Sequence, residues 1–177
     1  DTGRMSEPED IVEAVCEVLK PVPQDLAGKR VVITAGPTHE PIDPVRFIGN
    51  RSSGKMGIAL AGEAARRGAA VKLVLGPTSL DVPRGVECVR VQTAAEMLQA
   101  ALSAFQTADA AICAAAVADY TPATPADHKL KKANERLDRI ELVETVDILA
   151  ELSRQKGERC VIGFAAETDN VVEYAER

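Results

Sequence analysis

The residues best suited to binding an anion lie in the long segment that follows the apolar run 31–34. Ser52, Ser53 and Gly54 stand directly before a helical pattern, and Arg46 and Asn50 come a few residues earlier. Backbone N–H groups at a helix N-terminus favour a phosphate or carboxylate, and an arginine and an amide side chain could bind the same anion. The alternatives are that Ser52 only caps the helix and that Arg46 is a surface charge. The segment therefore predicts an anion site without identifying the ligand.

Two common nucleotide motifs fit this segment poorly. Gly49–Lys55 has the spacing of a phosphate loop, but Met56 stands where a Ser or Thr would hold magnesium. A dinucleotide site would need three closely spaced glycines after the first strand and an acidic residue at the end of the second. The chain lacks that glycine spacing, and its second apolar run ends in Gly76-Pro77. A nicotinamide-dependent enzyme is therefore disfavoured.

Two later segments add candidate ligand contacts. Asp119 follows a run of small residues, where its carboxylate could hold a metal, bond a ribose or base, or only bond the backbone of a turn. Residues 128–132, His-Lys-Leu-Lys-Lys, form the densest basic cluster of an acidic chain, which could neutralise a triphosphate or form a solvated face. His39 and His128 have no carboxylate partner at helical spacing, so we assign them no role. The residue types alone leave these alternatives open.

The elements that must position these residues alternate between apolar runs and helical patterns. We expect strands at 31–34, 71–75, 86–91, 110–116, 140–143 and 159–164, and helices at about 54–68, 93–105 and 146–155. A capping box of Thr93 and Glu96 marks the start of the second helix. This alternation predicts an α/β fold, Rossmann-like and doubly wound, with a mainly parallel sheet and helices on both faces. The loops after Thr34, Ala116 and Phe164 should then converge on one site at the carboxyl ends of the strands.

The first 28 residues are predicted to be a separate piece. Ser6 is expected to cap a helix that ends before Pro21, and its apolar residues fall on one face. Residues 21–28 contain two prolines and no periodicity, which is typical of a linker. The main domain is predicted over residues 29–177.

Composition excludes several classes of partner. The formal net charge of −6 disfavours broad binding to nucleic acid, which needs a basic surface. No apolar run approaches the roughly 20 residues that span a bilayer, so we expect no membrane association. Four cysteines lack the spacing of a metal site or a redox pair, and we interpret them as small hydrophobic residues of a reduced, cytoplasmic protein. They are Cys16, Cys88, Cys113 and Cys160.

Long, ordered motifs of the main domain resemble bacterial phosphopantothenate–cysteine ligase. They are Thr34–Thr38, Glu40–Ile48, Asn50, Ser52–Gly57, Ala115–Tyr120 and Gly163–Thr168. The resemblance covers about residues 29–177. It implies the family's reaction, which joins 4′-phosphopantothenate to L-cysteine in coenzyme A biosynthesis with CTP and a divalent cation such as Mg²⁺. It also implies an acyl-cytidylate intermediate, formed with release of pyrophosphate and then attacked by the cysteine amine with release of CMP.

The resemblance implies roles for individual residues as well. Asn50 and Arg46 would hold the acyl-cytidylate, and Lys129 would assist its formation. Nucleotide contacts would come from Cys113, Ala114, Ala115, Asp119, Lys129, Val146, Asp147, Ile148, Leu149 and Phe164, with Val146 in place of a proline common in the family. A phosphate-binding loop is predicted from Ser52, Ser53 and Gly54 together with Lys132 of the basic cluster. No metal ligands are assigned.

Two departures from the family pattern concern the ends of the chain. Family members continue beyond Arg177 with another strand, further lysines and much of the dimer-forming region, so we expect a ligase domain that is incomplete at its C-terminus and homodimeric when complete. Gly3–Pro8 resembles the junction with a flavin-dependent decarboxylase, which implies a bifunctional parent whose FMN binds only in that other half. A non-catalytic nucleotide-binding fragment and an NAD(P)-dependent oxidoreductase remain the alternatives.

Overall fold

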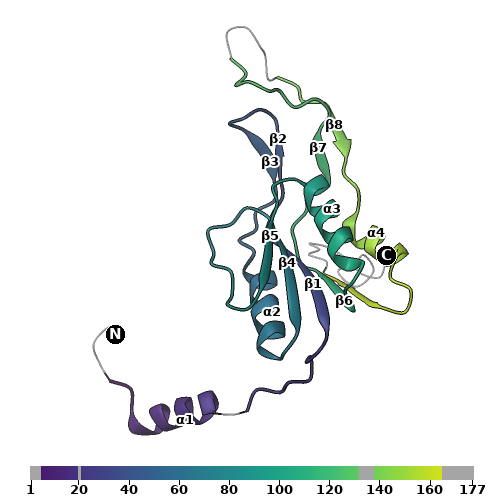
Figure 1. The fold of residues 1–177 in the computed structure, drawn as a ribbon. Coiled ribbons are helices and arrows are strands. Elements are labelled where there is room, and N and C mark those ends of the chain that lie inside the picture. The colour runs from purple at the N-terminus through teal and green to yellow at the C-terminus, as the bar shows by residue number, and fades with distance from the viewer. Residues whose placement is uncertain (1–4, 20, 132–137, 165–177) are drawn as a thin grey trace, which may run out of the picture.

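A five-stranded parallel sheet forms the centre of this computed structural model, which describes residues 5–19, 21–131 and 138–164 (Figure 1). In chain order the strands are β1 (Arg30–Ala35), β4 (Ala70–Leu75), β5 (Glu87–Arg90), β6 (Ala110–Cys113) and β9 (Cys160–Gly163). Across the sheet they lie in the order β5-β4-β1-β6-β9. The chain therefore builds outward from β1 to one edge and then from β6 to the other, which confirms the predicted doubly wound α/β fold.

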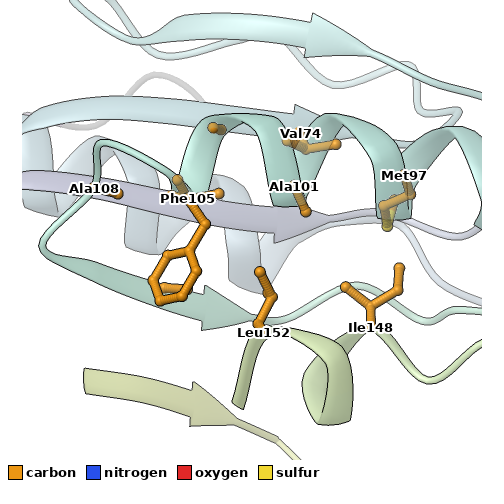
Figure 2. Close-up of a cluster of buried hydrophobic side chains, with 10 residues drawn as sticks. Val74, Met97, Ala101, Phe105, Ala108, Ile148 and Leu152 are labelled. Carbon is orange, nitrogen blue, oxygen red and sulfur yellow. The ribbon is translucent and has the colours of Figure 1, made fainter. Parts of the chain in front are cut away.

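Among the described residues, three helices cover the sheet: α2 (Lys55–Arg66), α3 (Ala94–Phe105) and α4 (Ile148–Arg154). Successive residues of β1 point to opposite faces. Ile33 belongs to the apolar cluster that includes α2, and Val32 belongs to the cluster that includes α3 and α4. Figure 2 shows the second cluster, in which Phe105 of α3 and Leu152 of α4 lie against each other beside the sheet. Helices thus cover both faces of the sheet at its buried strands β1 and β4, as a parallel sheet requires.

The two longer sheet-covering helices begin differently. Thr93 Oγ1 accepts a hydrogen bond from the Glu96 N–H at 3.2 Å, and the Glu96 carboxylate accepts one from the Thr93 N–H, which confirms the predicted capping box of α3. α2 is instead preceded by Gly54, whose φ is 78° and which provides no side-chain cap. Ser52 is therefore not the helix cap. Its hydroxyl accepts a bond from the Gly54 N–H at 3.3 Å, so this N–H, one of those expected to bind the anion, already has a partner within the chain.

Two antiparallel hairpins extend beyond the carboxyl ends of the sheet strands (Figure 1). One pairs β2 (His39–Pro41) with β3 (Phe47–Gly49), and the other pairs β7 (Tyr120–Pro122) with β8 (Leu142–Glu144). The sequence prediction missed the first hairpin and β7. It also extended the 110–116 strand past Cys113, where β6 ends, and treated 140–143 as part of the parallel alternation. Strands of three residues, two of them ending in proline, are too short to show a period.

A further helix, α1 (Pro8–Leu19), lies apart from the sheet in Figure 1. Pro8 occupies the first helical position, which suits a residue without an N–H, and the Ile11 N–H bonds the carbonyl of Glu7. The helix therefore starts one residue later than a cap at Ser6 would give. The predicted apolar face of α1 is exposed at Ile11, Val12, Val15 and Leu19. Within the described residues, no helix combines the length and the apolar character that crossing a membrane requires.

Candidate active site

A cavity of about 570 Å³ opens at the carboxyl ends of β1 and β6. These neighbouring strands mark the point where the sheet order reverses, which is where doubly wound sheets bind their ligands. The volume lies within the range of about 300–1,000 Å³ that is usual for small-molecule sites. The cavity is lined by Thr34, Asn50, Cys113, Ala115, Ala116, Val117, Asp119, Tyr120, Glu144, Thr145, Val146, Asp147, Ile148 and Leu149.

Backbone hydrogen bonds join the loops that leave β1 and β6. The Thr34 carbonyl accepts from the Ala114 N–H at 3.1 Å, and the Gly36 carbonyl accepts from the Ala116 N–H at 2.9 Å. Gly36 has a φ of 79°, a conformation that glycine adopts without strain. The alanines of 114–116 leave the backbone open to close approach by a ligand. The edge of the cavity is therefore a rigid, small-residue surface.

Asn50 and Asp119, both predicted as site residues, line this same cavity. Asn50 Nδ2 donates to the Val117 carbonyl at 2.8 Å, which fixes the amide against the loop after β6. That bond uses one N–H of the amide, and no described residue uses its carbonyl oxygen. Asp119 accepts through its backbone carbonyl from the Thr145 N–H at 2.8 Å, which ties it to the segment before α4.

Residues 144–149 form the third wall of the cavity. Thr145 Oγ1 donates to the Ala118 carbonyl at 2.6 Å, so the segment is held against the loop after β6. Asp147 is the N-cap of α4, and its carboxylate accepts from the Ala150 N–H at 3.0 Å. Its predicted position beside a nucleotide is compatible with this cap, because a carboxylate has further acceptor sites. Val146 and Leu149 add exposed apolar surface.

The Cys113 thiol also faces this cavity. Burial raises the pKa of Cys113 to about 11, with a further contribution from the negative charge of Asp147 and an opposing hydrogen bond with Thr34. Because a thiolate is the reactive form, this cysteine is a neutral wall residue near pH 7. The polar side chains that remain in the lining are Asn50, the hydroxyl residues and the carboxylates.

Several predicted residues lie outside this wall. Arg46 lines a second cavity, of about 710 Å³, together with Phe47 and residues 125–127. Lys129 is exposed in the next stretch of chain, and Phe164 follows β9 with a half-exposed ring. None of these three is among the described residues that line the first cavity. The loops after β1 and β6 thus meet, as predicted. Phe164 was predicted to reach the same site, but it is not among the described residues that line the first cavity.

The phosphate-binding prediction is only partly covered by the structure. Gly54 packs so closely on Gly36 that an added Cβ would lie 3.2 Å from the Gly36 Cα. The N-terminus of α2 therefore lies beside the end of β1, close to the candidate cavity. Ser53 is held through its carbonyl, which accepts from Thr78 Oγ1 at 2.8 Å. Lys132 and the motif residues 165–168 lie outside the described residues.

Asp43 is a buried carboxylate to which the sequence analysis gave no role. The Arg46 guanidinium and the backbone N–H groups of Val45, Arg46 and Leu130 bond this carboxylate and hold the pKa of Asp43 well below its ordinary 3.8, although burial acts in the opposite direction. Asp43 accepts bonds from the N–H groups of Val45 and Arg46, which form an Asx turn. The sequence Asp43-Pro44-Val45-Arg46 is typical of such a turn and could have predicted it.

The described residues contain no group of three or more His, Cys, Asp or Glu side chains that could hold a metal ion. The carboxylates of Asp119, Glu144 and Asp147 line the cavity without forming such a group. This part of the chain therefore does not fit an all-protein magnesium cage. Magnesium sites completed by substrate phosphates need only one or two carboxylates.

The remaining predictions concern histidines and cysteines. His128 Nδ1 lies 2.7 Å from the carboxylate of its neighbour Asp127, a partner that a search at helical spacing misses. His39 stacks on Phe47 across the β2–β3 hairpin, with ring centroids 3.7 Å apart. All four cysteines are free. Cys160 lies in β9, within the predicted strand 159–164, and is exposed there.

The doubly wound sheet and its cavity at the reversal point define a Rossmann-like, ligand-binding α/β domain. Residues 26–177 match the model of the DNA/pantothenate metabolism flavoprotein C-terminal domain, and the chain belongs to that family. It is 51% identical over 177 residues to the coenzyme A biosynthesis bifunctional protein CoaBC of Bacillus subtilis, covering 99% of this chain and 43% of that protein. The CoaBC of Escherichia coli K12 is 49% identical over 178 residues, covering 99% and 44%.

Solved structures agree with this assignment. The crystal structure of the C-terminal domain of CoaBC superposes with a TM-score of 0.74 and 51% identity, covering 85% of this chain and 71% of that one. A mutant of Cab2 in complex with phosphopantothenate-cysteine has a TM-score of 0.64 at 17% identity, covering 93% of this chain and 73% of that one, and supports the fold alone. The chain spans a little over two fifths of the curated relatives it matches.

Proposed function

We propose that this chain is a ligase domain that joins 4′-phosphopantothenate to L-cysteine in coenzyme A biosynthesis, with CTP as the activating nucleotide. The observation that supports this most strongly is the cavity at the β1–β6 reversal point. Asn50, Asp119, the end of β6 and residues 146–149 meet there, in a chain 51% identical to a coenzyme A biosynthesis protein. The same positions are those that the ligase resemblance assigns to the intermediate and the nucleotide.

The proposed reaction has two steps. A carboxylate oxygen of phosphopantothenate attacks the α-phosphorus of CTP, a new P–O bond forms, and the bond to the β-phosphate oxygen breaks to release pyrophosphate. The amine of cysteine then attacks the acyl carbonyl of the acyl-cytidylate, loses a proton and displaces CMP. Neither step needs a protein nucleophile, so the domain contributes positioning and stabilisation of charge. The raised pKa of the Cys113 thiol agrees with a mechanism that uses no protein nucleophile.

Within this scheme Asn50 is proposed to bond the carbonyl or phosphate of the acyl-cytidylate. Its bond to the Val117 carbonyl orients the amide before the ligand arrives, which lowers the entropic cost of binding. Asp119 and the apolar residues Val146 and Leu149 are proposed to contact CTP, with Phe164 nearby in sequence after β9. Ser52, Ser53, Gly54 and Lys132 are proposed to bind phosphate, and Arg46 and Lys129 to act on the intermediate. Mg²⁺ would enter as the complex with the triphosphate.

Exposed apolar side chains on α1 and on the hairpins support a larger assembly. Residues 1–28 are proposed to come from a preceding decarboxylase domain that binds FMN, because the exposed apolar face of α1 resembles a helix that has lost its packing partner. The two hairpins expose apolar side chains that a second copy could cover, in line with a homodimer. These side chains are Phe47, Tyr120, Leu142 and Val143. The four free cysteines suit the reducing cytoplasm.

The test uses the full-length gene product with phosphopantothenate, cysteine, Mg²⁺ and either CTP or ATP. We expect phosphopantothenoylcysteine, CMP and pyrophosphate in equal amounts with CTP, identified by mass spectrometry. Asn50→Ala should lower the rate by about 100-fold, the usual effect of removing one preorganised donor. Gln106→Ala, which truncates an exposed amide next to α3 and outside the cavity, is the matched control and should leave the rate unchanged.

Two results would contradict this proposal. Tight binding of CTP in calorimetry without any product would favour a non-catalytic nucleotide-binding module. A nicotinamide-dependent absorbance change would favour an oxidoreductase on the same fold.

A further inference from the structure

We infer that Asp43 is a positioning residue, which holds the loop that contains Lys129 in place for the first chemical step. The inference rests on the proposed function, because the role of Lys129 is part of that proposal. Asp43 itself lies at the second cavity and does not line the first, so it would act through the loop. Three sets of contacts support this assignment.

The first set fixes the carboxylate in its own turn. Asp43 Oδ1 accepts from the N–H groups of Val45 and Arg46, each at 2.8 Å. The Asp43 side chain is fully buried, whereas that of Arg46 is 39% exposed. A buried charge needs both a counter-charge and hydrogen bonds to be stable. Arg46 supplies the counter-charge through Nε, at 3.0 Å from Oδ2, and through a second contact from its terminal nitrogen.

The second set reaches across 87 positions of sequence to Leu130. Oδ2 of Asp43 accepts from the Leu130 N–H at 3.1 Å, and the Arg46 guanidinium donates to the Leu130 carbonyl at 2.9 Å. Both polar backbone groups of the residue after Lys129 are therefore held by one ion pair. These two bonds fix the peptide groups on either side of Leu130.

The third contact holds the start of the same loop. The Ala126 N–H donates to the Ile42 carbonyl at 2.9 Å, one residue before Asp43. Lys129 therefore sits between two anchors, at 126 and at 130, and both come from the segment 42–46. The same segment continues through β3 to Asn50 in the first cavity. It thus connects the loop of Lys129 to the proposed site of the acyl-cytidylate.

The negative charge of Asp43 is the part of this arrangement that a neutral analogue cannot reproduce. In Asp43→Asn, one side-chain atom becomes an N–H donor in a place surrounded by the donors of Arg46, Val45 and Leu130. Each carboxylate oxygen accepts at least two of these bonds, so at least two must be lost whichever oxygen is replaced. Val45 and Arg46 are close to Asp43 in sequence, whereas Leu130 is 87 positions away. The bond to Leu130 should therefore break first and release the loop of Lys129. A displacement of about 1 Å in a group that assists catalysis can lower a rate by about 100-fold.

The experiment is a double-mutant cycle on pyrophosphate release from CTP and phosphopantothenate, in the full-length gene product. We expect Asp43→Asn to slow release at least about tenfold in the parent protein, and less than about twofold when Lys129→Ala is already present. Glu40→Gln is the matched control. It alters another buried acid of the same hairpin, which bonds the Ala94 N–H of α3 at 2.8 Å and has no bond to the 126–130 loop. Its effect should be the same in both backgrounds.

Equal effects of Asp43→Asn in the two backgrounds would show a purely structural role and overturn the inference, while the proposed function stands. No effect of Lys129→Ala would remove the inference together with the role of Lys129. A parent protein that forms no product with CTP would contradict the proposed function itself. The anchor is then tested by hydrogen exchange at the Leu130 amide, which should become at least about tenfold faster in Asp43→Asn but not in Glu40→Gln. Unchanged exchange would overturn the anchor as well.

Discussion

Gly57 and Gly62 form a matched pair on α2, and alanine should have opposite effects at the two positions. Gly57 is buried against the end of β1, where an added Cβ would lie 2.4 Å from the Ala35 Cβ and 3.2 Å from the Thr34 carbonyl oxygen. At Gly62 the nearest atoms belong to Pro83, at 3.4 Å. Carbon atoms in contact normally lie about 3.5–4.0 Å apart, so Gly57→Ala requires a shift of about 1 Å between helix and strand.

The magnitude follows from two opposing effects. Alanine is favoured over glycine inside a helix by about 1 kcal/mol, whereas overpacking of a core costs about 1–3 kcal/mol. Because the atoms around Gly57 include rigid backbone, we expect Gly57→Ala to lower the free energy of unfolding by about 1–2 kcal/mol. Gly62→Ala should raise it by about 0.5–1 kcal/mol, since little opposes the helix propensity. The shift at Gly57 should also separate Gly54 from Gly36, at the predicted phosphate site.

Urea denaturation of the 177-residue chain, followed by circular dichroism, measures both variants. The midpoints should move in opposite directions, with unchanged slopes. In thermal unfolding, each kcal/mol corresponds to about 2–4 °C for a domain of this size. Equal stabilisation by the two alanines would refute the close approach of α2 to β1 and, with it, the placement of the α2 N-terminus beside the cavity.

Three further predictions concern the site. Gly163→Ala would place a Cβ 2.4 Å from Leu149 Cδ2, and Leu149 lines the cavity that we propose to bind CTP. We therefore expect the KM for CTP to rise by about tenfold in steady-state assays; an unchanged KM would remove Leu149 from the proposed nucleotide site. Cys113, whose pKa is raised to about 11, should be alkylated by iodoacetamide far more slowly than exposed Cys16 and Cys160 at about pH 8, as measured by peptide mass spectrometry; equal labelling would contradict its burial. The pKa of Asp43 is depressed, so its ionised form stabilises the fold above the ordinary value of 3.8 and loses that effect as pH falls. The difference in urea midpoint between the parent chain and Asp43→Asn should therefore shrink between about pH 6 and about pH 3, and a constant difference would argue against the charged cluster.

The parts of the fold that the sequence predicted are those with strong local signals. β1 is a continuous β-branched run and α3 carries its own capping box, so neither depends on distant partners. The two hairpins have no such signal, because strands of three residues become recognisable only through their cross-strand partners. The alternative in which Ser52 caps the helix is wrong for a related reason: only the tertiary approach of Gly54 to Gly36 shows that glycine, and not serine, precedes α2.

The position of the candidate site could be predicted from one rule, that doubly wound sheets bind ligands where the strand order reverses. The rule brings the ends of β1 and β6 together, and the structure places Cys113, Ala115 and Asp119 there with Asn50. It gives no information about Asp43, whose importance depends on Leu130 on a distant loop. Thr145 is a similar case, since the hydrogen bond from its hydroxyl to the Ala118 carbonyl can be recognised only in the folded chain. Long-range polar pairs of this kind have no fixed spacing in sequence.

The most direct test of the proposed reaction is a rapid-quench experiment on the full-length gene product with CTP, Mg²⁺ and phosphopantothenate but no cysteine. We expect a burst of one pyrophosphate per active site, together with a bound acyl-cytidylate that releases CMP only when cysteine is added. An absence of pyrophosphate before cysteine is added, or an equal burst with Asn50→Ala, would contradict acyl-cytidylate chemistry in the cavity between β1 and β6.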